Sequence, residues 1–272
     1  MPLTKEATDR TATIDGIQIH YNEAGSGPAL ICTHGGGPGA NAWDNTRHSF
    51  DALAEHFRVI LLDMPGFGES QKLVSRNGVP MDFFCAKLQL GLMDQLGIDR
   101  AHLYGSSAFS ATAIRFGIEY PDRVGKIVVQ AWSPVHGPQT DGLKSLGIYA
   151  NNPTRENMVK MCEYFIPRPE LRPDAFIDAR FRAAQIPGHL ESRREFSGQA
   201  SSDVTPDLPK LKTDVLITWG EADGVIAIEG LLDALRLIPN SRAYVWGDRS
   251  GHFVCYEHPE EFARVVTAFL TS

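Results

Sequence analysis

Six short apolar runs recur along the chain, and they restrict its possible folds more than any other feature. They are ALICTH (29–34), RVILLD (58–63), AHLYGS (101–106), KIVVQA (126–131), DVLITWG (214–220) and RAYVWG (242–247). Most are continuous, β-branched or apolar runs, as expected for strands that a parallel sheet buries on both faces. Segments with helical character, such as 82–96 and 107–120, fit between them. This alternation predicts an α/β fold with a doubly wound, mostly parallel sheet.

Two parts of the chain depart from the alternation. The segment ATIDGIQIHYNEAGSG alternates in polarity and contains Asp15-Gly16, which predicts an antiparallel hairpin at the sheet edge. Residues 134–209 contain helix signatures but no convincing strand; Asn152-Pro153 predicts the cap and first position of one helix, and Pro173 opens another. We expect a core domain of residues 1–133 and 210–272, with 134–209 as a helical lid inserted between sheet strands, over the edge where such sheets bind ligands.

Composition limits the partners. The net charge of −7, with no run of Lys or Arg, argues against nucleic acid or an anionic membrane, although one Arg could still hold a small anionic substrate. We see no secretion signal and no apolar run long enough to span a membrane. The four cysteines have no metal-binding spacing, which favours buried, reduced thiols in a cytoplasmic protein. The oligomeric state stays open, a homo-oligomer included.

The segment Gly105-Ser106-Ser107-Ala108-Phe109 follows a predicted strand and opens a predicted helix. A Gly-x-Ser-x-Gly turn at such a junction lifts a nucleophilic hydroxyl above the sheet, next to the N–H groups of the helix. This register makes Ser107 the nucleophile, although the final glycine is replaced by Phe109. The alternative is that the serine only caps the helix.

An acid and an imidazole follow in the order that a serine nucleophile on this kind of sheet requires. Asp223 lies just after the predicted strand 214–220, and His252 lies after 242–247 and before the last helix. A serine needs an imidazole as base, and the imidazole needs a carboxylate to orient it. Taken singly, Asp223 could form a turn and His252 could be a loop residue. Together with Ser107 they predict a catalytic triad.

A glycine run, His34-Gly35-Gly36-Gly37-Pro38-Gly39, directly follows the first core strand. It could cradle a phosphate, but it has neither the P-loop Gly-Lys-Ser/Thr nor the GxGxxG register. After this strand, such a loop supplies an N–H group to an oxyanion hole. We assign the two donors to Gly36 and Ala108, and expect His34 to play a structural part under the loop.

The motifs HGGGPGANAWDN, LLDMPGFGES, WGEAD and GHFVCYEHPEEF together resemble the meta-cleavage product hydrolases. These are α/β-hydrolases that cut a carbon–carbon bond in 2-hydroxy-6-oxo-hexa-2,4-dienoates during the bacterial degradation of aromatic compounds. The resemblance covers nearly the whole chain and implies an α/β-hydrolase fold, a dienoate carboxylate as substrate, and no cofactor or metal.

The resemblance also implies substrate-binding residues. Asn45 would bond the oxygens of the dienoate, Arg180 would bind its carboxylate, and Phe165 and Phe253 would line the pocket. Helical spacing places Arg180 on the stripe of Phe176, Ile177 and Ala184, but its stem could simply cover the apolar face of the lid, and both phenylalanines could be packing residues. Ser106, where the family usually has Asn, is a further candidate for substrate contact.

Two other functions compete with carbon–carbon bond hydrolysis. An ester or lactone hydrolase would use the same triad, and only Asn45 and Arg180 distinguish the two, because a neutral ester needs no carboxylate clamp. A non-catalytic binding protein on the same fold is disfavoured by the intact triad. A haloalkane dehalogenase would need Asp at the position of Ser107 and is excluded.

Overall fold

The computed structural model describes residues 3–135, 137–198 and 201–272. Its centre is an eight-stranded sheet in the order β1-β2-β4-β3-β5-β6-β7-β8, in which all pairs from β4 to β8 are parallel. The strands are β1 (Asp9–Ile14), β2 (Ile17–Ala24), β3 (Ala29–Thr33), β4 (Arg58–Leu62), β5 (Ala101–Ser106), β6 (Val124–Gln130), β7 (Val215–Gly220) and β8 (Ser241–Trp246). All six predicted core strands are present, and the doubly wound α/β prediction is confirmed.

The predicted edge hairpin is also present. Strands β1 and β2 pair antiparallel, with Ile14 opposite Ile17, and β2 pairs antiparallel with β4. Asp15 and Gly16 both have positive φ, of 51° and 80°, the backbone conformation of the two-residue turn that favours Asp-Gly. This hairpin is the antiparallel part of an otherwise parallel sheet.

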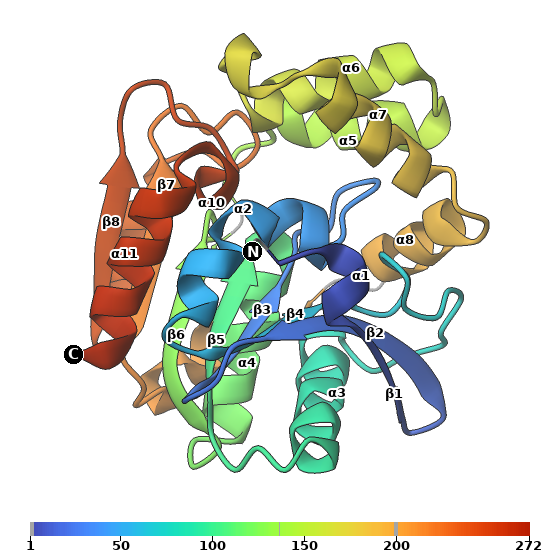
Figure 1. Cartoon of the computed structure of the whole chain (residues 1–272). Helices are drawn as coiled ribbons and strands as arrows, with labels where there is room; N and C mark the ends of the chain where they lie inside the picture. Colours follow the sequence, from blue (N-terminus) through green and yellow to red (C-terminus); the bar gives the residue numbers. More distant parts are fainter. Residues whose placement is uncertain (1–2, 136, 199–200) are drawn as a thin grey trace.

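Helices cover both faces of the sheet (Figure 1). Successive strand residues point to opposite faces, so Ile31 and Ile60 belong to one apolar core while Leu30 and Val59 belong to the other. The first core is closed by α3 (Met81–Gln95), α4 (Ser110–Glu119) and α9 (Glu229–Leu237), and the second by α2 (Ala42–Ala54), α10 (Val254–Glu257) and α11 (Pro259–Thr271). A short helix, α1 (Lys5–Thr8), precedes the hairpin.

Four helices lie between β6 and β7, and Figure 1 shows them beyond one end of the sheet strands. They are α5 (Asp141–Asn151), α6 (Arg155–Phe165), α7 (Asp174–Ala184) and α8 (His189–Gly198), with 3₁₀ turns at Pro169–Leu171 and Thr205–Lys210. The expected start of the first of the two predicted helices was wrong by two residues. Thr154 caps α6, because its hydroxyl accepts a hydrogen bond from the Asn157 N–H.

No helix among the described residues is both long enough and apolar enough to cross a membrane.

Candidate active site

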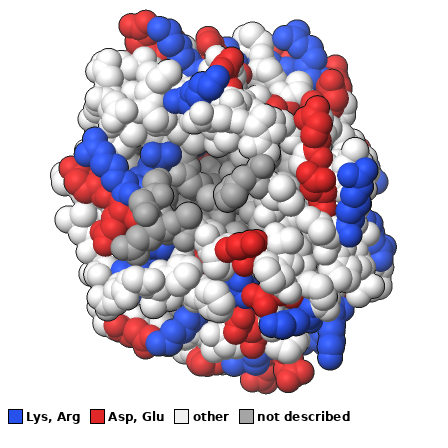
Figure 2. All heavy atoms as spheres, turned by 180° about the vertical axis from the view of Figure 1, so that it is seen from behind, with Lys and Arg blue, Asp and Glu red and all other residues white. Residues whose placement is uncertain are grey.

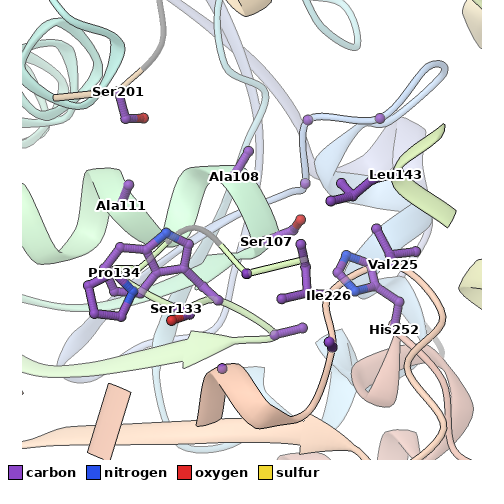
Figure 3. Close-up of a pocket in the computed structure, with 18 of the residues that line it drawn as sticks. Ser107, Ala108, Ala111, Ser133, Pro134, Leu143, Ser201, Val225, Ile226 and His252 are labelled. Carbon is purple, nitrogen blue, oxygen red and sulfur yellow. The ribbon is translucent and has the colours of Figure 1, made fainter. Parts of the chain in front are cut away.

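Ser107 lies on the turn between β5 and α4. Its φ is +50°, in the left-handed region that non-glycine residues rarely adopt, and the 3₁₀ turn Ser107–Phe109 leads directly into the helix. Gly105 allows this turn to be tight: a Cβ there would lie 2.7 Å from the Ser110 Cα. This strained backbone conformation directs the side chain of Ser107 toward a cavity. Figure 3 shows the side chain near Ala108 and facing the side that carries His252.

Asp223 and His252 form a buried pair at the ends of two neighbouring strands. His252 Nδ1 lies 2.8 Å from Asp223 Oδ2, and the two side chains are 1% and 0% exposed. The other carboxylate oxygen accepts hydrogen bonds from the N–H groups of Val225 and Ile226. The carboxylate is thus fixed on both oxygens and orients the imidazole, whose remaining edge faces the cavity that Ser107 also lines.

The glycine loop after β3 packs directly on the serine turn. A Cβ on Gly35 would lie 3.3 Å from the Ser107 Cβ, and one on Gly36 would lie 3.0 Å from the Ala108 Cβ. The Ala108 N–H belongs to the first turn of a helix, where intrahelical acceptors are missing. The loop therefore brings the Gly36 and Ala108 peptides side by side near the Ser107 hydroxyl.

His34 supports this loop from below, as the sequence predicted. It is fully buried; its Nδ1 bonds to the Gly35 carbonyl, and its Nε2 accepts a hydrogen bond from the Met64 N–H. Burial lowers the pKa of His34, so the imidazole is neutral and can accept at Nε2. It is not among the residues that line the cavity.

Phe109, which replaces the final glycine of the elbow motif, points away from the cavity. Its ring is fully buried between His34 and Phe67, with ring centroids 5.1 and 5.5 Å away. Edge-to-face contacts of this kind are favourable. The large side chain is accommodated under the elbow and leaves the position of Ser107 open to the cavity.

Ser106, predicted from the sequence to contact the substrate, does not line the cavity. Its side chain is fully buried, and its hydroxyl accepts a hydrogen bond from Gln130 Nε2 at 3.2 Å. The same amide group donates to the His252 carbonyl at 3.0 Å, and Gln130 Oε1 accepts from the Tyr104 hydroxyl at 2.8 Å. Gln130, at the end of β6, thus links the residue before Ser107 to the loop that carries His252. Gln130 was not predicted from the sequence, although a polar residue that closes an apolar strand is a usable signal.

The cavity above these groups has a volume of about 610 Å³ and is walled by α4, by the loops after β6 and β7, and by the helices α5–α8. Arg180, Phe165 and Phe253, all predicted to bind substrate, line it. The two phenyl rings stack with centroids 4.9 Å apart, and the Arg180 guanidinium lies over them at 4.9 and 5.4 Å. Trp132 and Arg193 also line the cavity and were missed, because neither stands out in its sequence context.

Arg180 places a buried positive charge at the wall of the cavity. Its side chain is 5% exposed, and its Nε and Nη2 have no hydrogen-bond partner within the described residues. Burial lowers its pKa, as expected for a cation taken out of water. A guanidinium in this position is able to bind an incoming carboxylate, because the cost of removing it from water has already been met in the free protein.

Asn45 is not part of the main cavity wall. It lies on α2, is 5% exposed, and borders a separate gap of about 10 Å³ that Arg180 also borders. Its Nδ2 has no hydrogen-bond partner among the described residues. The structure therefore places Asn45 near Arg180 but does not bring its amide into the cavity as the sequence analysis expected.

One cluster elsewhere has the composition of a metal site. Asp9, His20 and Glu69 bring their ligand atoms within 4.8 Å of one another near the edge hairpin. His20 is already bonded to Asp63 and Asp9, and Lys5 pairs with Glu69. The cluster is a network of ion pairs, and its three members do not line the cavity that holds Ser107.

Comparison with known proteins agrees with this geometry. Residues 28–153 match the family model for the alpha/beta hydrolase fold. The chain is 35% identical to a 2-hydroxy-6-oxononadienedioate/2-hydroxy-6-oxononatrienedioate hydrolase of a Pseudomonas species, over 93% of this chain and 91% of that protein. It is 35% identical to a 2-hydroxy-6-oxo-6-phenylhexa-2,4-dienoate hydrolase of Comamonas testosteroni, with the same coverage.

Solved structures give the same result. The meta-cleavage product hydrolase of Pseudomonas fluorescens IP01 superposes with a TM-score of 0.86 at 29% identity, covering 96% of this chain and 97% of that one. A 2-hydroxy-6-oxo-6-phenylhexa-2,4-dienoate hydrolase of Rhodococcus superposes with a TM-score of 0.88 at 23% identity, over 97% and 98% of the two chains, a likeness of fold.

Proposed function

This chain belongs to the meta-cleavage product hydrolases, enzymes of the α/β-hydrolase fold, and we propose that it hydrolyses the C5–C6 bond of a 2-hydroxy-6-oxo-hexa-2,4-dienoate formed by ring fission of an aromatic compound. The observation that carries the proposal is Arg180. A buried guanidinium with two unpartnered nitrogens borders the same cavity as Ser107 and His252. A dienoate carries the carboxylate that such a site needs, whereas a simple neutral ester does not.

In the proposed mechanism, His252 first serves ketonisation of the bound dienol. The C2 hydroxyl loses a proton and C5 gains one, which yields the 2,6-dioxo tautomer and a tetrahedral C5. The pair with Asp223 at 2.8 Å suits His252 to this transfer, because the carboxylate orients the ring and stabilises the imidazolium. The C1 carboxylate is held by Arg180 throughout.

Ser107 then attacks the C6 carbonyl, with His252 accepting its proton. The Gly36 and Ala108 N–H groups stabilise the oxyanion that forms on C6. When the C5–C6 bond breaks, the bonding pair passes into the dienolate, whose C2 oxygen takes the proton that His252 accepted from Ser107, to give 2-hydroxypenta-2,4-dienoate and neutral His252. Water activated by His252 then hydrolyses the acyl-serine to a carboxylic acid.

We further propose that residues 134–209 act as the lid of this site. Two residues of their helices, Phe165 and Arg180, line the cavity, and the Phe165 carbonyl accepts a hydrogen bond from the His252 N–H at 2.8 Å. A cytoplasmic location is part of the proposal, and it is supported by the four cysteines, which are all free and buried.

The proposal is tested with two substrate types side by side. Purified enzyme is given a yellow 6-phenyl or 6-methyl dienoate, whose loss of absorbance reports cleavage, and p-nitrophenyl acetate. We expect kcat/KM for a dienoate to exceed that for the ester by at least about 100-fold, since only the dienoate engages Arg180. Turnover of the ester with both dienoates untouched would instead indicate an ester or lactone hydrolase.

A further inference from the structure

A second cationic side chain, Arg193 on α8, borders the cavity and has no role in the mechanism above. It is partly buried, and its Nε donates a hydrogen bond to the Gly36 carbonyl at 3.0 Å. Burial, and then the neighbouring charge of Arg180, lower the pKa of Arg193 to about 10. The side chain therefore remains cationic at neutral pH.

Elsewhere in the chain, a buried arginine can have several acidic partners. Arg115, for example, is 1% exposed and lies within 4 Å of Asp82, Glu119 and Asp207. Across the described part of the chain, no carboxylate forms an ion pair with Arg180 or Arg193, and the charge that acts on Arg193 is another cation. Two guanidiniums that both lack a carboxylate partner in one cavity are unfavourable unless the ligand supplies the negative charge.

The two arginines contact different parts of the glycine loop. Arg193 bonds to Gly36, the proposed oxyanion donor, whereas Arg180 approaches Gly37, where an added Cβ would lie 2.9 Å from its Nη2. With C6 of the substrate at Ser107 and Gly36 and its C1 carboxylate at Arg180, Arg193 is left for a group attached on the C6 side.

Acidic side chains also border the cavity, but they are more exposed. Glu229 and Asp203 are exposed, and the half-exposed Asp233 lies 3.7 Å from Arg236. Figure 2 shows a hollow on this face of the molecule with charged side chains of both signs around it. Solvent screens exposed charges much more than buried ones, so the charge of the partly buried Arg193 is screened less than the charges of these carboxylates.

We propose that Arg193 binds a second anionic group of the substrate, so that the preferred dienoates carry a carboxylate at the end of a short 6-substituent. The inference rests on the proposed function and narrows it to a dicarboxylate substrate class. The 610 Å³ cavity has room for such a ligand. If Arg193 only fixed the Gly36 peptide, its loss would affect every substrate alike.

The test uses two substrates that differ in one group. These are 2-hydroxy-6-oxonona-2,4-dienedioate and 2-hydroxy-6-oxonona-2,4-dienoate, whose C9 is a carboxylate and a methyl group respectively. We expect the wild type to prefer the dicarboxylate by about tenfold or more in kcat/KM. Arg193→Met should lower kcat/KM for the dicarboxylate by about 10- to 100-fold, mainly through KM, and change the monocarboxylate value less than threefold.

Two further variants control the measurement. Arg194→Met removes the same charge from the exposed neighbouring position on α8, where the side chain bonds to the Ala150 carbonyl, and should leave both substrates unchanged. Arg193→Lys keeps a cation and should recover part of the preference for the dicarboxylate. Equal losses on both substrates in Arg193→Met, or a wild type without preference, would overturn the inference and leave the proposed function standing.

Binding of the acid products keeps the inference testable if neither dienoate is cleaved, a result that would refute the proposed function. Succinate and butyrate are the acids released from the two substrates, and they differ by the same carboxylate. We expect succinate to bind the wild type at least about tenfold more tightly than butyrate, by calorimetry, and Arg193→Met to remove the difference. Equal binding of both acids by the wild type would overturn the inference.

Discussion

Ser106 and Ser107 are adjacent in the chain, but their side chains lie in different surroundings. Ser107 faces the cavity that His252 lines, whereas Ser106 is fully buried and bonded to Gln130. We expect Ser107→Ala to lower kcat on a dienoate by roughly 10³- to 10⁶-fold, because triad members act as a unit. The matched variant Ser106→Ala should keep activity within about tenfold. Steady-state kinetics of the two variants decide the register, and the reverse ranking would make Ser106 the nucleophile.

The protonation of Glu257, which bonds to the loop that carries His252, makes the stability of the fold depend on pH. Its carboxylate accepts a hydrogen bond from the Gly251 N–H and is 6% exposed, and burial raises its pKa from the ordinary 4.5 to about 7. Between these two pH values the unfolded chain releases the proton while the folded protein retains it. Raising the pH through this window therefore favours unfolding, by about 3 kcal/mol in total. Above pH 7 both states are ionised and the effect levels off.

The variant Glu257→Gln isolates this contribution, because an amide can still accept the Gly251 bond but cannot ionise. We expect the free energy of unfolding of Glu257→Gln, relative to the wild type, to increase by about 3 kcal/mol from pH 4.5 to pH 7.5. Urea unfolding of both proteins at the two pH values measures the difference, in which other titrating groups cancel. A constant difference would show that the folded protein does not hold Glu257 protonated.

At the scale of elements, sequence patterns predict those strands and turns whose formation depends on residues within one short segment. Apolar, β-branched runs mark the buried strands, and Asp15-Gly16 marks the edge hairpin, because each signal lies within one short segment. The same holds for the positions of Ser107, Asp223 and His252, which follow the ends of three strands. Parallel strands bring those ends to one edge of the sheet. The positions of the three residues after their strands therefore predict that their side chains lie close together.

Contacts between distant elements could not be predicted in this way. Ser106 and Asn45 lie on predictable elements, yet the surroundings of their side chains include Gln130 and Arg180, 24 and 135 residues further along the chain. Arg193 stands among other charges in the segment ESRREF, so nothing local separates it from a surface residue. Its place at the cavity depends on the packing of α8 against the glycine loop, where it bonds to the Gly36 carbonyl.

Phe109, in the turn between β5 and α4, packs against residues of neighbouring loops. The ring fills the space between His34 and Phe67 under the elbow and has no exposed surface. We expect Phe109→Ala to lower the free energy of unfolding by about 3–5 kcal/mol, since the site is closed on both sides and leaves a cavity. Urea denaturation measures this, with Tyr164→Ala at a 37% exposed position as the control, expected to change stability by less than about 0.5 kcal/mol. A small effect of Phe109→Ala would mean that the elbow collapses around the missing ring.

At the scale of the whole molecule, the site combines groups from distant parts of the chain around one cavity. The sheet supplies the turn of Ser107 and the pair Asp223–His252, and the helices between β6 and β7 supply Phe165 and Arg180. The cores on the two sheet faces are apolar and stabilise the fold, whereas the unpaired Arg180 charge does not. Burial of such a charge trades stability of the free protein for affinity toward an anion.

Arg180→Met tests this trade directly, because methionine retains an apolar stem and removes the charge. On a dienoate we expect kcat/KM to fall about tenfold to 100-fold or more, as a charged hydrogen bond to the carboxylate is lost, while hydrolysis of p-nitrophenyl acetate stays nearly unchanged. The free energy of unfolding should rise by about 1–3 kcal/mol, since the loss of an unpaired buried charge outweighs the lost contacts with Phe165 and Phe253. Kinetics on both substrates and urea denaturation provide the three values. Equal losses on dienoate and ester, together with lower stability, would assign Arg180 to supporting the helices above the sheet instead of binding the substrate.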